Sequence, residues 1–188
     1  MRYRFAGSSL GPAAPKGGVY VAQPHVATDL KSAGIGPFET IDARLLIEPE
    51  VAAIAASKVT DGLLAELAAC IAQMRQAHAQ GHEADAGDHR FHVAIASATG
   101  NGMLVAVCDQ LWRAQLNSPI WDDIHRRMRM NRYWKVWLND HEQIFAAIKL
   151  GSSIQARIEM IRHLDNVRQA LLANSGSPSP QERRRMTS

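Results

Sequence analysis

Apolar residues recur at helical spacing through most of this chain, from Phe38 to about Leu172, and alternating apolar and polar stretches are almost absent. Because an α-helix repeats every 3.6 residues, apolar residues three and four positions apart lie on one face, so this pattern predicts amphipathic helices. The apolar groups run over residues 45–55, 63–74, 91–95, 104–112, 134–150 and 154–171. The body of the chain is therefore predicted to be all-helical.

Glycine, proline and cap residues between these groups indicate where the helices begin and end. Thr60 with Asp61, and Ser152 with Ser153, are typical of N-caps, where a side-chain oxygen accepts a hydrogen bond from a free backbone N–H. Pro49 lies inside the first group, where its missing N–H predicts a local kink or break. The glycines expected to end helices are Gly81, Gly100 and Gly151. About six helices with short loops predict an all-α fold, an antiparallel bundle of six to seven helices.

The two ends of the chain differ in composition from this body. Residues 1–36 are rich in glycine and proline, and the run GGVYVAQP predicts one edge strand from Val19 to Ala22, with no obvious partner strand. Residues 174–188 have the Ser, Pro and Arg content of a disordered tail. We therefore expect a leading segment over 1–36, a helical domain over 37–173 and a tail over 174–188.

Charge and cysteine content exclude few functions. The net charge is +3 and the sequence pI is about 9.1, which gives little support for nucleic-acid binding by charge alone. The arginine-rich stretch 117–132 is compatible with an anion-binding surface, and more simply with a solvated face. Cys70 and Cys108 lie among apolar helix-forming residues, as reduced buried thiols do. With no signal-peptide or membrane-spanning run either, a cytoplasmic protein is expected.

The polar residues that most need an explanation are Asp88 and His92, in the stretch AGDHRFHVAIASATGN. Residues four apart on a helix lie one above the other, so both side chains can point at one centre. Phe91 and Ile95 flank the pair at core-facing positions, which places His92 at the border of the core. A single histidine there is more often a hydrogen-bonded core residue than a metal ligand.

Two further histidines lie at helix positions that face the predicted core. His141 precedes Ile144, Phe145 and Ile148 on its helix, and His163 lies among Met160, Leu164 and Val167. Three imidazoles and one carboxylate are donors suited to a borderline divalent ion such as Zn, Ni, Mn or Fe, with positions left for water or an anion. The alternative is that these histidines bind no metal, since the chain also carries histidines at positions that do not follow an apolar helix face: His78, His82, His89 and His125.

Common catalytic motifs are missing from the sequence. The stretch HEQIF lacks the second histidine of a zinc-protease helix, and neither a Gly-rich phosphate loop nor a C-x-x-C pair occurs. An enzyme would therefore depend on the metal alone.

Four stretches, ETIDARLLIEPEVAAIAA, DHRFHVAIASATGN, NDHEQIFAAI and RHLDNV, resemble in order and spacing the effector-binding (FCD) domain of the FadR subfamily of GntR transcriptional regulators. The resemblance covers about residues 37–172. It implies an all-helical domain, and LWRAQLNSPIWDDIH further resembles the hexuronate-operon repressors of this subfamily. Gln115 and the stretch KLGSSIQAR depart from the pattern of those relatives.

The resemblance assigns roles to individual residues. The family's metal ligands fall on Asp88, His92, His141 and His163, and the effector is a small organic acid whose carboxylate can complete the coordination of the divalent metal. Arg44, in the first helix, is implied to face the effector, the alternative being a surface pair with Glu48 one turn on. Asn166 is a further candidate effector contact.

The resemblance also implies partners. Family members are usually homodimers and carry a winged helix-turn-helix before the effector domain. The stretch KGGVYVAQP looks like the end of its wing, so residues 1–36 are interpreted as a wing remnant and linker. DNA binding is then expected only if a longer native chain or a partner supplies the recognition helix.

The leading hypothesis is the ligand-sensing domain of a bacterial regulator, not an enzyme. One rival is a metal-dependent hydrolase or lyase, which needs a general base beside the metal. The other is a truncated regulator that acts only through dimerisation.

Overall fold

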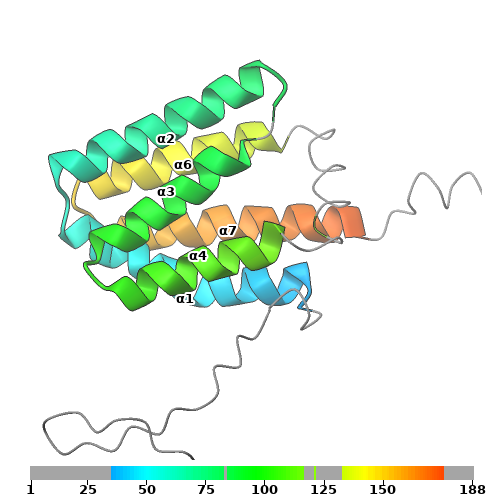
Figure 1. Ribbon diagram of the computed structural model, residues 1–188, viewed down its shortest axis with the longest axis horizontal. Helices are drawn as coiled ribbons and strands as arrows, with labels where there is room; N and C mark the ends of the chain where they lie inside the picture. The colour runs from blue at the N-terminus through cyan, green and yellow to red at the C-terminus, as the bar shows by residue number, and fades with distance from the viewer. Residues whose placement is uncertain (1–34, 83, 117–120, 122–132, 176–188) are drawn as a thin grey trace, which may run out of the picture.

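The computed structural model describes residues 35–175 apart from 83, 117–120 and 122–132. This part of the chain folds into six helices and contains no strand, which confirms the predicted all-α class (Figure 1). The helices are α1 Pro37–Ser57, α2 Asp61–Ala79, α3 Asp85–Ala98, α4 Gly102–Leu116, α6 Trp134–Lys149 and α7 Ser153–Ser175. The predicted strand at Val19–Ala22 and the arginines of 117–132 lie outside the described residues.

The helix ends follow the cap and glycine signals closely. Thr60 caps α2, since its hydroxyl oxygen accepts a hydrogen bond from the Leu63 N–H at 3.1 Å. Gly81, Gly100 and Gly151 follow α2, α3 and α6 with φ of 70°, 72° and 67°, a left-handed conformation that favours glycine. Helix α1 continues through Pro49 to Ser57.

The first and last helices hold the bundle together. α1 packs mainly against α7, α6 also packs against α7, and α2 packs on α3 (Figure 1). The core between them is apolar, and its fully buried members include Phe91, Ile144 and Leu164. Both cysteines are buried and unpaired, as expected. No described helix combines the length and apolar character needed to cross a membrane.

A glycine sets the closeness of α2 and α3. A Cβ atom on Gly87 would lie 2.9 Å from Cγ of Met74 and 3.2 Å from the carbonyl oxygen of Cys70, both on α2. Only glycine fits this approach without displacing its neighbours. The first turn of α3, which carries Asp88, is thereby pressed onto α2.

Candidate metal centre

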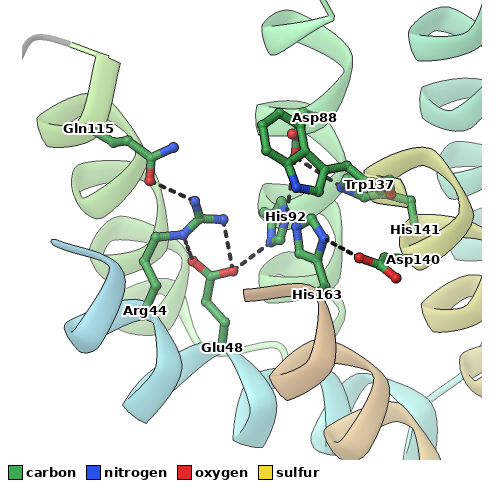
Figure 2. A network of polar contacts seen from close by, with 9 residues as sticks. All are labelled: Arg44, Glu48, Asp88, His92, Gln115, Trp137, Asp140, His141 and His163. Carbon is green, nitrogen blue, oxygen red and sulfur yellow. Dashed lines mark hydrogen bonds and ion pairs between the residues drawn. The ribbon is translucent and has the colours of Figure 1, made fainter. Parts of the chain in front are cut away.

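Three helices bring together the four residues singled out in the sequence. Asp88 and His92 come from α3, His141 from α6 and His163 from α7, and one ligand atom of each lies within 4.8 Å of the others (Figure 2). All three histidines are buried, and the Asp88 side chain is 22% exposed. The four donors therefore form one cluster with a single partly open member.

Asp88 is at the centre of this cluster. Its Oδ1 lies 3.0 Å from Nε2 of His141 and 3.2 Å from Nε2 of His92, its neighbour one turn along α3 (Figure 2). Asp88 is also in the first turn of α3, where the helix dipole favours a negative charge. Burial alone would raise the pKa of Asp88, but the facing imidazoles of His141 and His92 hold that pKa well below its usual value.

Behind each imidazole, the Nδ1 atom faces an oxygen of the protein. His141 Nδ1 lies 2.7 Å from the Trp137 carbonyl oxygen, and His92 Nδ1 lies 2.5 Å from Oε2 of Glu48. His163 Nδ1 lies 3.7 Å from Oδ2 of Asp140. For His92 and His141 this leaves Nε2, the atom that faces Asp88, as the nitrogen available to a metal.

Glu48 is part of a buried chain of charges on α1. Its Oε1 accepts a hydrogen bond from Nε of Arg44 at 2.6 Å, and Arg44 Nη1 donates to Oε1 of Gln115 on α4 at 2.9 Å (Figure 2). Burial by itself would raise the Glu48 pKa, but Arg44 and His92 lower it to about 2. The Arg44 and Glu48 pair expected one turn apart is thus present, and it is buried.

His163 is in a different electrostatic setting from its neighbours. Burial lowers its pKa to about 4, and the nearby His141 adds to that shift. The rings of His141 and His163 lie 4.4 Å apart between centroids. A neutral imidazole is the form that binds a metal, so burial keeps His163 ready as a ligand.

Two features of the cluster suit a divalent metal. Both ring nitrogens of His92 and the Nδ1 of His163 are buried and make no hydrogen bond of regular geometry within the described chain. Buried polar atoms normally have a partner, so His92 Nε2 in particular lacks one that a cation would supply. Three imidazoles and a carboxylate are also a usual donor set for borderline divalent ions.

A cavity opens onto this cluster. Asp88, His141 and His163 contribute to its wall, and Arg44 and Gln115 line it from α1 and α4. All four tryptophans of the chain also line it: Trp112, Trp121, Trp134 and Trp137. The cavity wall therefore combines apolar aromatic side chains with a few polar groups that include metal donors, as small-molecule sites do.

The two candidate effector contacts lie in different surroundings. Arg44 lines the cavity, but its Nε and Nη2 are directed at Glu48 and its Nη1 at Gln115. The Asn166 amide donates to Oδ2 of Asp140 at 2.8 Å, and Asn166 is absent from the described wall of the cavity. Asn166 thus holds the carboxylate that faces His163.

Sequence reasoning missed three residues at this site. Glu48 contacts His92. Its position four residues after Arg44 and four before the buried Ala52 could have indicated that its side chain faces the core. Gln115 is 2% exposed and faces Arg44, and the sequence singled it out only as a departure from the pattern of the relatives. His78 lines the cavity and stacks on Trp134, with ring centroids 4.7 Å apart.

The sequence of the chain is similar to that of known proteins. The FCD domain family matches residues 39–166. The chain is 38% identical to the Uxu operon transcriptional regulator of Escherichia coli, over 73% of this chain and 54% of the relative. It is 32% identical to the Uxu operon regulator of Haemophilus influenzae, over 87% of this chain and 62% of the relative. The chain thus spans between half and two thirds of these relatives.

A solved structure has the same fold. The Streptococcus agalactiae GntR structure superposes with a TM-score of 0.61 at 22% identity, covering 77% of this chain and 61% of the other. At this sequence identity, the similarity shows only that the two proteins share a fold.

Proposed function

The chain belongs to the FCD domain family, and we propose that it is the ligand-sensing domain of a bacterial GntR-type transcriptional regulator that binds a small organic acid at a divalent metal. The observation that carries this proposal is the convergence of Asp88, His92, His141 and His163 in one cluster, three members of which also line the tryptophan-lined cavity. A donor cluster with an open side suits a metal that also accepts a ligand.

The proposed effector is a hexuronate-type sugar acid. The relatives named for the Uxu operon support this class, and so does the cavity, whose aromatic walls can pack on the C–H face of a sugar. When bound, a Zn, Ni, Mn or Fe ion supplies a Lewis-acid centre for the effector carboxylate. Asp88, His92, His141 and His163 hold the ion, and Arg44 is proposed to contact the acid at the α1 side. Asn166 is proposed to act on the site indirectly, by holding the Asp140 carboxylate that faces His163.

The domain is proposed to work as a homodimer in the cytoplasm. An effector shifts a regulator only if it binds two arrangements with different affinity. The site joins α1, α3, α6 and α7, so effector binding can bias how these helices pack. We propose that DNA binding requires a winged helix-turn-helix, supplied by a longer chain or by a partner.

Metal analysis and ligand binding test this function together. We expect stoichiometric transition metal in the purified protein and calorimetric binding of a hexuronate, both lost in His141→Ala. A wild-type protein without metal, or sugar-acid binding unchanged in His141→Ala, would contradict the proposal. Turnover of the sugar acid would instead favour a metal-dependent hydrolase or lyase.

A further inference from the structure

Among the described residues, Glu48 is the carboxylate that contacts a candidate metal ligand although its own helix carries no ligand. It lies on α1, its side chain is 2% exposed, and its Oε2 is 2.5 Å from Nδ1 of His92. A nitrogen and a carboxylate oxygen at this distance repel each other unless a proton lies between them. Arg44 Nε donates to the same carboxylate at 2.6 Å and favours its ionised form, so the contact favours a proton on Nδ1 of His92.

This proton position fixes the state of the other ring nitrogen. With the proton on Nδ1, the lone pair of a neutral His92 is on Nε2, the atom that lies 3.2 Å from Asp88. Neither ring nitrogen of His92 makes a hydrogen bond of regular geometry, and Nε2 is the one that faces the donor cluster. Glu48 thus selects the tautomer that can bind a metal from inside the cluster.

Arg44 holds Glu48 in turn. Its guanidinium reaches both carboxylate oxygens, at 2.6 Å from Nε to Oε1 and 3.4 Å from Nη2 to Oε2. Gln115 and the ring of Trp112, whose centroid lies 5.0 Å from the Arg44 Cζ, fix the guanidinium from α4. A chain of contacts therefore runs from α4 through Arg44 and Glu48 to His92 (Figure 2).

We propose that Glu48 is a positioning residue for the metal centre, which fixes the tautomer and orientation of His92, and that Arg44 acts on the centre by holding Glu48. This inference rests on the proposed metal-binding function. Carboxylates behind a histidine ligand raise its basicity, and their loss typically lowers metal affinity by about 10- to 100-fold.

The first test is the dissociation constant for Zn²⁺, measured by competition with a chelator on folded protein. Glu48→Gln keeps the side-chain shape but removes the charge, and we expect its affinity to fall about tenfold. Glu50→Gln is the matched control, because Glu50 lies on the same helix, pairs with Arg157 at the surface and is 59% exposed. Its Zn²⁺ affinity should equal that of the wild type.

A double variant separates positioning from a merely structural role. In Arg44→Met with Glu48→Leu, apolar side chains replace the buried ion pair, an exchange that often leaves stability unchanged or improved. We expect the double variant to fold with a melting temperature near that of the wild type and to bind Zn²⁺ about 10- to 100-fold more weakly. In nitrogen NMR spectra of the metal-free protein, the Nδ1–H form of His92 should no longer be favoured. Wild-type Zn²⁺ affinity in Glu48→Gln and in the double variant would overturn the inference. Absence of Zn²⁺ binding in the wild type would instead overturn the proposed function.

Discussion

Nε2 of His141 lies 3.0 Å from Oδ1 of Asp88, although 53 residues separate them in the chain. The contact joins α6 to the first turn of α3. Phe91 packs beneath it, with its ring edge-on to His141 at 4.9 Å between centroids. The donor cluster is therefore built on the apolar core, and its geometry depends on how α3 and α6 pack.

Metal removal should destabilise the protein. A ligand that binds only the folded state at 100 times its dissociation constant contributes about 2.7 kcal/mol, which for a chain of this size corresponds to a rise in melting temperature of about 5–10 °C. We expect a chelator to lower the melting temperature by this amount in a calorimetric scan. The same chelator should leave His141→Ala unchanged, and an equal shift in both proteins would count against the site.

The metal-free protein should lose stability through His163 as the pH falls from 6.5 to about 4. The pKa of His163 is lowered from 6.5 to about 4, so in this window the unfolded chain binds a proton that the folded protein does not. The difference corresponds to at most about 3 kcal/mol at the acid end. Urea unfolding at several pH values should give a flatter profile for His163→Gln, and equal slopes would contradict this assignment.

Gly87 should tolerate no larger side chain. In Gly87→Ala the new Cβ meets Met74 and the Cys70 backbone, so we expect a loss of about 1–3 kcal/mol from overpacking. Gly102→Ala is the control, because its Cβ would have no atom within 4 Å at the start of α4. Denaturant unfolding should show Gly102→Ala to be neutral or stabilised, and similar losses in both variants would contradict the close approach of α2 and α3.

Substitution of His78 should weaken effector binding and leave metal binding unchanged. It lines the cavity with Asp88 and His141 and is held by its stack on Trp134. A lost hydrogen bond to a charged ligand costs about 1.5–3 kcal/mol, so His78→Ala should bind a hexuronate at least about tenfold more weakly. His89→Ala is the control, since His89 pairs with Asp109 and is not among the residues described in the cavity wall. Unchanged hexuronate affinity in His78→Ala, or weakened Zn²⁺ affinity, would contradict this role.

Much of the fold could be predicted from the sequence because its signals are local. Apolar spacing, the Thr60 cap and the glycines at 81, 100 and 151 act within one or two helical turns, and these elements are where the structure has them. The i, i+4 spacing of Asp88 and His92 likewise ensures that both face the same way. The inward phase of His141 and His163 was readable from their own helices.

Which helix faces meet, and how deeply each side chain is buried, depends on the packing of the helices. Helical spacing shows which way a side chain points but not how deeply it is buried. A surface pair of Arg44 and Glu48 therefore stayed open as the alternative to a pocket role, until the packing of α1 against α3, α4 and α7 buries both. The same packing places Asn166 behind Asp140 and brings Gln115 to Arg44 across 71 residues. The helices and the types of donor residue could thus be predicted from local patterns along the chain. Which carboxylates lie behind the imidazoles could not, because that depends on contacts between residues far apart in the chain.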